Sequence, residues 1–224
     1  MIIIIKNEIL ISIILCCYNS EKFIKSTLDS INKTSSNKIE LIIIDDGSTD
    51  NTYDIINNYQ LNIPKKIHKQ KNQGLATSRN KAIELSSGKW IAIIDHDDEI
   101  LYKTIEKFQN IILSNENNNI GLVFGNTNIM LENGYKYPRY TNDKNNPINY
   151  SLKKNNCYKE LLLKGCFIGS SSSLFKKSLV SKVKGFEKKY IITCDYHFFL
   201  KISLITDFHY IDEVLSNWRN HEDQ

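Results

Sequence analysis

Three short runs of almost uninterrupted apolar residues constrain the fold of this chain more than any other feature of its sequence. They span Ile9–Cys16, Ile39–Asp45 and Trp90–Asp95, and each has the length of a β-strand. Strands that are apolar on both faces are typical of parallel sheets covered by helices. Segments with the helical spacing of apolar residues separate these runs, at Ser20–Ile31 and Leu75–Ser86. The alternation predicts an α/β fold with a doubly wound, mostly parallel central sheet and helices on both faces.

Polar side chains follow each run at the point where the strand is expected to end. Tyr18 and Asn19 follow the first run, Asp45 and Asp46 close the second, and Asp95-His96-Asp97 closes the third. Ligands of such Rossmann-like sheets bind beyond the carboxyl ends of the strands, so we expect one crevice to hold all three groups. The loop CCYNSEKF has no glycines, which argues against an NAD-binding enzyme and against a nucleotidyltransferase.

The pattern changes after the helix predicted at Leu101–Ser114. A polar, Asn-rich loop at Tyr140–Asn156 is of a length that is usually functional or mobile. The segment Gly169–Phe175 is either part of a binding wall or a strand edge. Strands are expected at Ile120–Phe124, Thr127–Leu131 and Tyr135–Tyr137, with a hairpin turn at Asn133-Gly134, and helices near Tyr158–Lys164, Lys176–Val183 and Asp195–Ile205.

Composition describes a soluble globular protein, with 41% hydrophobic and 24% charged residues. The net charge of +4 comes from lysines spread along the chain, which argues against a nucleic-acid partner but leaves anionic phosphates or an anionic membrane surface open. The five cysteines form no CxxC pair and favour a reducing compartment. Because MIIIIK is too short for a signal sequence and no apolar run could span a bilayer, we expect a cytoplasmic protein.

The acids after the third strand predict a metal site. Carboxylates at Asp95 and Asp97 can both reach one hard cation, and Mg²⁺ or Mn²⁺ takes such oxygens together with a diphosphate. The alternative is a loop of solvated acids. His96 is expected to be solvated or hydrogen-bonded, and His221 is either a surface residue or a third metal ligand.

Other candidates each have a structural alternative. Tyr18 either stacks on a nucleobase or belongs to the core. Asp46 either accepts a hydrogen bond from a ligand or caps a turn with Ser48. Gly74 precedes a helix start that favours anions, and Arg79 either braces a phosphate or carboxylate or lies exposed on that helix. Asp195 is either a helix cap or a general base that deprotonates a hydroxyl.

Four segments, taken in order, resemble motifs of the family 2 inverting glycosyltransferases, which have the nucleotide-diphospho-sugar transferase (GT-A) fold. They are ISIILCCYNSEKFIKSTLDSI, IELIIIDDGSTDNT, NQGLATSRNKAIELSSGKWIAIIDHDD and VKGFEKKYIITCDYHFFLKIS. The resemblance covers about residues 9–221. It implies one GT-A domain, with residues 1–115 binding the nucleotide-sugar donor and residues 116–224 binding the acceptor and supplying the base.

The resemblance also implies roles for single residues. Tyr18 and Asp46 would contact the uracil of a UDP-sugar, Asp97 would coordinate the metal, and Asp195 would activate the acceptor hydroxyl. The predicted nucleotide-sugar site comprises Cys16, Tyr18, Asn19, Asp46, Gly74, Arg79, Asp95 and His96, and the predicted Mn²⁺ or Mg²⁺ ligands are Asp97, Asp95 and His221.

Further implications concern the acceptor and two departures from the family. The acceptor would be a glycan or a lipid-linked sugar of a bacterial surface polysaccharide, with peripheral association at the inner membrane left open. The family usually has Pro-Thr where this chain has Cys16-Cys17, and often an acid where it has Cys194. The alternative function is a non-catalytic nucleotide-sugar-binding module of a larger glycan-synthesis enzyme.

Overall fold

The computed structural model of the protein describes residues 9–34, 38–114, 119–140 and 152–222. The opening MIIIIK and most of the predicted loop at Tyr140–Asn156 lie outside the described residues. None of the helices in the described part of the chain combines the length and the apolarity needed to cross a bilayer.

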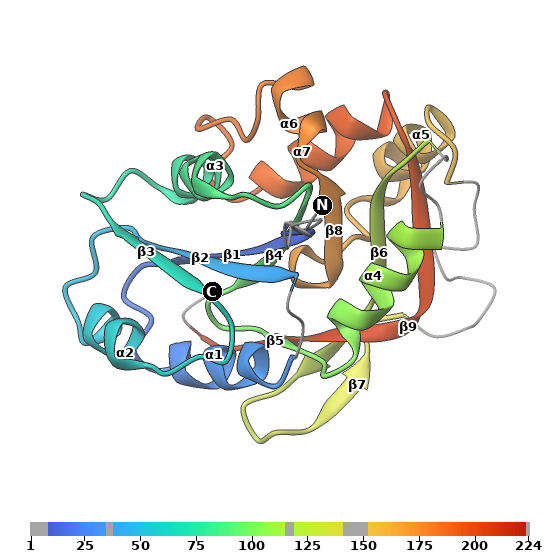
Figure 1. Cartoon of the computed structure of the whole chain (residues 1–224). Helices are drawn as coiled ribbons and strands as arrows, with labels where there is room; N and C mark the ends of the chain where they lie inside the picture. Colours follow the sequence, from blue (N-terminus) through green and yellow to red (C-terminus); the bar gives the residue numbers. More distant parts are fainter. Residues whose placement is uncertain (1–8, 35–37, 115–118, 141–151, 223–224) are drawn as a thin grey trace, which may run out of the picture.

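The first half of the chain forms the parallel part of the sheet (Figure 1), in the order β3-β2-β1-β4. The predicted strands at Ile39–Asp45 and Trp90–Asp95 are confirmed to the residue. All residues of β1 and β2 are buried, because helices cover both faces of the sheet. The strands are β1 (Ile11–Cys17), β2 (Ile39–Asp45), β3 (Lys65–Lys69) and β4 (Trp90–Asp95), and all pair in parallel.

The second half of the chain continues the same sheet with antiparallel and mixed pairing. After β4 the order is β8-β6-β9-β5, and β7 pairs with β6. The two strands predicted at Ile120–Phe124 and Thr127–Leu131 are one strand, and its hairpin with β7 is confirmed. The strands are β5 (Glu99–Ile100), β6 (Ile120–Met130), β7 (Lys136–Pro138), β8 (Ser173–Lys176) and β9 (Asp207–Arg219).

Helices cover the two faces of the sheet in separate layers (Figure 1). On one face α3 (Leu75–Leu85), α5 (Asn156–Lys164), α6 (Ser178–Lys182) and α7 (Cys194–Ser203) enclose an aromatic core that includes Phe124, Phe175, Phe186, Phe198 and Phe199. On the other face α1 (Ile24–Asn32), α2 (Thr52–Asn58) and α4 (Thr104–Ser114) enclose an aliphatic core. A single 3₁₀ turn (Ser170–Ser172) precedes β8.

Two predictions about element boundaries were wrong for identifiable reasons. The helix expected from Ser20, capped by Asn19 or Ser20, begins at Ile24, because the Ser20 amide donates to Thr52 Oγ1 (2.6 Å) and the Asn19 amide to Ser48 Oγ (3.1 Å). Of the segment Gly169–Phe175, the residues after the 3₁₀ turn belong to β8, which lies inside the sheet between β4 and β6 and is not a strand edge.

Candidate active site

A cavity of about 650 Å³ opens at the carboxyl ends of β1, β2 and β4. Parallel strands end at the same edge of a sheet, and here Cys16 pairs with both Ile44 and Asp95. The volume lies in the range of ligand pockets in proteins. All but one of the residues predicted for the nucleotide-sugar site line it: Cys16, Tyr18, Asp46, Gly74, Arg79, Asp95 and His96, and Asp97 and Asp195 do so too.

Asn19 is the exception. It does not line the cavity, and its side-chain oxygen accepts hydrogen bonds from the backbone N–H (2.8 Å) and hydroxyl (3.3 Å) of Thr49. Asn19 has a φ of +49°, which asparagine tolerates better than most residues, and it joins the loop after β1 to the loop after β2. Tyr18, in contrast, is 47% exposed at the cavity, so the core alternative for it was wrong.

Asp45 and Asp46 point to opposite sides, as expected for neighbours at a strand end. Asp45 accepts a hydrogen bond from the amide of Ser48. The turn is therefore capped by Asp45, whereas the sequence had suggested Asp46 for this contact. Asp46 accepts from the amides of Gln73 (2.9 Å) and Gly74 (2.8 Å). It therefore holds the loop that begins α3, where Gly74 has a φ of +85°.

Arg79 is buried and binds two carboxylates, so it is not an exposed helix residue. Its side chain is 1% exposed, and its two terminal nitrogens donate separately to Asp95 (2.6 Å) and to Asp195. Of the phosphate and carboxylate partners expected for it, the structure shows two carboxylates of the protein itself, and its contact with the nucleotide stays a prediction. Burial lowers the pKa of Arg79, but Asp195 and Asp95 outweigh it, so that the pKa lies above its ordinary value.

Asp195 is not a helix cap. Thr193 occupies the N-cap position of α7, and the carboxylate of Asp195 accepts hydrogen bonds from Arg79 and from Ser170 Oγ (2.8 Å). Cys194, which stands where the family often has an acid, lies 3.4 Å from Arg79 Nη1. Burial and Asp195 raise the pKa of this thiol to about 11, so it remains protonated at neutral pH.

Asp97 and His221 come together although 124 positions separate them in sequence, with 3.0 Å between Asp97 Oδ2 and His221 Nε2. The His221 ring packs on Phe23, with 4.5 Å between ring centroids, and only 3% of its side chain is exposed, so the surface alternative was wrong. Asp95 faces Arg79 instead. Among the described residues no group of three or more His, Cys, Asp or Glu side chains is spaced to hold a metal ion, so the predicted set of three ligands is not assembled.

Arg219 is a residue that the sequence reasoning missed, and Asp98, the last acid of the predicted polar cluster at residues 95–98, was assigned no role by it. Arg219 donates through its backbone N–H to Asp98 (3.0 Å) and through Nε to the carbonyl of Asp97 (2.8 Å), so the end of β9 holds the acidic loop in place. Asp98 is buried and also accepts from Ser171 Oγ (2.6 Å). Nothing local in the sequence signals these contacts, because they join segments more than 70 residues apart.

His96 projects into the same region without a partner for its inner nitrogen. Its Nδ1 is buried and has no hydrogen-bond partner among the described residues, while its carbonyl accepts from Thr27 Oγ1 (2.9 Å). Because Nδ1 is shielded from solvent, it is not the atom by which His96 lines the cavity, and the place of His96 in the predicted nucleotide-sugar site stays a prediction.

A second cavity of about 400 Å³ adjoins the first. The two share four lining residues, Asp95, Ile192, Asp195 and Trp218. Arg139, Cys166 and Tyr196 line only the second. Asp195 thus stands where two cavities meet, with room for one reactant on each side of its carboxylate.

The comparisons with known proteins agree with this geometry. The sequence profile described as "Glycosyl transferase family 2" matches residues 12–183. The chain belongs to this family. It is 31% identical to an uncharacterized glycosyltransferase of Methanocaldococcus jannaschii over 94% of the chain and 70% of that relative. It is 26% identical to a chondroitin synthase of Escherichia coli over 95% of the chain but only 29% of that protein.

Solved structures share the fold at low identity. Residues 1–349 of S. aureus TarS in complex with UDP-GlcNAc superpose with a TM-score of 0.74 and 21% identity, over 96% of this chain and 60% of that TarS fragment. A mannosyltransferase of Pyrobaculum calidifontis in complex with GDP-Man and Mn²⁺ gives a TM-score of 0.66 and 16% identity, over 93% of this chain and 56% of that one. The chain thus spans a little over half of the structures that it resembles.

Proposed function

We propose that this glycosyltransferase moves a sugar from a UDP-sugar to a hydroxyl group of a glycan or lipid-linked acceptor, with inversion at the anomeric carbon. The observation that carries the proposal is the position of Asp195 at the junction of two adjoining cavities. A transferase with two substrates needs a base that reaches both the acceptor hydroxyl and the donor sugar.

The larger cavity is the proposed donor site, and Tyr18, Asp46 and Cys16 are its proposed uracil contacts. Tyr18 offers an exposed ring for stacking on a base. Asp46 Oδ2 accepts one hydrogen bond from the protein and retains acceptor capacity for the imide N–H of uracil. The complexes of TarS with UDP and UDP-GlcNAc support this donor, whereas the GDP-Man complex of the mannosyltransferase makes GDP the rival to be tested.

Asp97 and His221 fit two ligands of a divalent cation. They bring a carboxylate oxygen and an imidazole nitrogen within 3.0 Å of each other, and Mn²⁺ or Mg²⁺ takes its other ligands from substrate phosphates and water. When bound, such a cation would neutralise charge on the departing nucleoside diphosphate. Asp95 is assigned to the ribose side of the donor, where Arg79 holds it.

The residues of the chain then divide the reaction between them. Asp195 removes the proton from the acceptor hydroxyl, and the oxygen attacks the anomeric carbon from the face opposite the diphosphate. Arg79 and Ser170 each bind one oxygen of Asp195, which fixes the plane of its carboxylate. Asp46 keeps the loop before α3 in position, and Arg219 does the same for the loop that carries Asp97.

The acceptor is proposed to belong to a surface polysaccharide, with the protein acting at the cytoplasmic face of the membrane. Relatives named for chondroitin synthesis and for teichuronic acid biosynthesis support the polysaccharide class. The cavity that contains Arg139, Cys166 and Tyr196 is the proposed acceptor site.

Calorimetric titration of UDP, with and without Mn²⁺, tests the donor site. Binding should require Mn²⁺ in the wild-type chain and should be lost in Asp97→Ala. Asp212→Ala is the matched control, since Asp212 is exposed on β9 and should leave binding intact. Tighter binding of GDP than of UDP would overturn the uracil assignment, and binding that ignores both Mn²⁺ and Asp97 would overturn the metal assignment.

The second candidate function is a nucleotide-sugar-binding module without turnover. The ion pair between Arg79 and Asp195 favours it, because it gives Asp195 a structural role that needs no acceptor. Transfer of sugar from UDP-GlcNAc to oligosaccharide acceptors, lost in Asp195→Asn, would exclude this candidate.

A further inference from the structure

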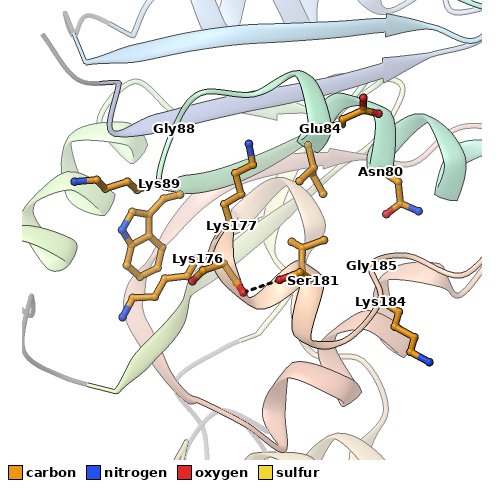
Figure 2. Close-up of a pocket in the computed structure, with 13 residues that line it drawn as sticks. Asn80, Glu84, Gly88, Lys89, Lys176, Lys177, Ser181, Lys184 and Gly185 are labelled. Carbon is orange, nitrogen blue, oxygen red and sulfur yellow. Dashed lines mark hydrogen bonds between the residues drawn. The ribbon is translucent and has the colours of Figure 1, made fainter. Parts of the chain in front are cut away.

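A third hollow, of about 920 Å³, lies at the opposite end of the sheet from the donor cavity. It is formed where β4 begins and β8 ends, between α3 and α6 (Figure 2). Its lining is mostly apolar, with Ile83, Trp90 and Val180 among the contributing residues. It shares no lining residue with the two cavities of the candidate active site.

The rim of this hollow is strongly basic. Glu84 is the one acidic residue among the described lining, and its Oε2 lies 3.1 Å from Nζ of Lys81, which is three residues earlier in α3. The lysine stems also cover the hollow with methylene groups while their ammonium ends remain near water. The lysines are Lys89, Lys176, Lys177 and Lys184.

The lysines are spread around the rim and do not converge on one point. Figure 2 shows Lys89 and Lys176 on one side and Lys184 on the other, and the Lys177 ammonium donates to the carbonyl of Ser86 (2.6 Å). A site for one phosphate would gather its donors around a single position, as arginine forks and helix starts do. Spread charges fit a partner whose negative charge is also spread over a surface.

The rim combines spread positive charge with an apolar lining. Lysines around an apolar surface are typical of segments that lie at an anionic membrane, where each lysine adds attraction to the lipid headgroups.

We infer that this lysine-rimmed hollow is the surface by which the protein docks on a membrane that contains anionic phospholipids. The inference is independent of the proposed donor and acceptor, since no residue of the hollow belongs to the active site. It also sets an orientation. The strand β4 runs from Trp90 at the hollow to Asp95 at the donor cavity, about 17 Å at the usual rise per residue, so the active site would open away from the lipid. Of the two proposed acceptors, this orientation favours the glycan over the lipid-linked sugar.

Co-sedimentation with vesicles tests the inference on the full chain. Wild-type protein should bind vesicles of phosphatidylcholine and phosphatidylglycerol at low salt, should bind phosphatidylcholine vesicles poorly, and should dissociate as salt rises. The double variant Lys176→Glu/Lys184→Glu should bind at least about 25-fold more weakly, from about fivefold for each lysine. Val180→Asp, which places a charge in the apolar lining, should also weaken binding.

The matched control is Lys103→Glu/Lys159→Glu, which makes the same change of net charge at exposed lysines outside the hollow. It should keep most of the binding. Equal losses in both double variants would show that net charge alone acts, and would overturn the inference. So would a wild-type protein that ignores phosphatidylglycerol, which would leave the hollow to a protein partner. Titration with UDP on the same samples reports separately on the donor site.

Discussion

Glu40 and Asp98 are buried carboxylates at opposite ends of the same sheet, and they differ in the charge of the groups that donate hydrogen bonds to them. Glu40, at the start of β2, accepts hydrogen bonds from Ser12 Oγ (2.7 Å) and from the amide of Ser87 (2.5 Å), and it pairs with Lys66 (2.9 Å). Asp98, just beyond the end of β4, is 3% exposed like Glu40, but its donors are the neutral groups of Ser171 and the Arg219 backbone.

The pKa values of the two carboxyls move in opposite directions. Burial raises the pKa of Glu40, but the donors of Lys66, Ser12 and Ser87 outweigh it, and the net pKa is lowered. Burial raises the pKa of Asp98, and the charges of Asp95 and Asp97 raise it further. One end of the sheet is thus electrically balanced, whereas the other keeps surplus negative charge, as a site that receives a cation would.

The largest expected effect tests whether the unbalanced end serves chemistry. Asp195→Asn keeps the shape of the side chain but removes the base, so transfer should fall by about 10²–10⁴-fold. The rate of UDP release in the presence of acceptor measures this, with calorimetry showing that UDP still binds. Transfer at the wild-type rate would mean that Asp195 only anchors Arg79.

Removing the buried cation Arg79 tests how much it stabilises the two carboxylates that it binds. Arg79→Met leaves Asp95 and Asp195 without their shared partner. The free energy of unfolding should drop by about 3 kcal/mol, the lower end of the range for buried pairs, because both carboxylates are partly exposed. Urea unfolding measures the loss, and Arg139→Met, at an exposed arginine, is the control. An unchanged midpoint would show that solvent already screens this cluster.

Sequence reasoning predicted the parallel half of the fold better than the antiparallel half, for a physical reason. The strands β1, β2 and β4 are buried on both faces and therefore read as continuous apolar runs. The strand β9 mixes buried and exposed residues without a regular period, its pairing with β6 contains register shifts, and it includes Asp207, Asp212 and Glu213, so its sequence resembles a loop. The strand β8 is only four residues long and follows a run of serines.

The candidate site residues also differ in how clearly the sequence signals them. Residues at strand ends, such as Asp46 and Asp97, were found because the topology places them at one edge. The burial of Arg79 depends on Asp195, 116 positions away, and a helix pattern gives no sign of it. Asn19 accepts a hydrogen bond from Thr49 of the neighbouring loop through the same amide chemistry that would bind a ligand, so its sequence context alone does not separate the two roles.

The balanced end of the sheet offers a pH test. Since the pKa of Glu40 is lower in the folded protein than in the unfolded chain, its stabilisation is present above the unfolded value and is lost as the pH falls through the folded value. Glu40→Gln should therefore cost about 1.5–3 kcal/mol at neutral pH and progressively less in acid. Urea unfolding across a pH series measures this, with Glu84→Gln, 69% exposed in its side chain, as a control that should change little. A cost that stays constant with pH would show that Glu40 contributes by packing alone.

The smallest expected effect concerns the lysines around the hollow at this end. Lys184→Glu should change the free energy of unfolding by less than about 0.5 kcal/mol, as is usual for surface substitutions. Lys176→Glu should cost at most about 1 kcal/mol, because Lys176 Nζ lies 5.4 Å from the centroid of the Trp90 ring. UDP affinity should stay unchanged, and no ion pair among the described residues is broken, unlike that of Lys66 with its buried partner Glu40. Urea unfolding and UDP titration measure both quantities on the samples used for vesicle binding. A loss of UDP affinity would mean that α3, which contributes to both the hollow and the donor cavity, couples the two ends of the sheet. No change would mean that the same sheet carries two independent functions, one at each end.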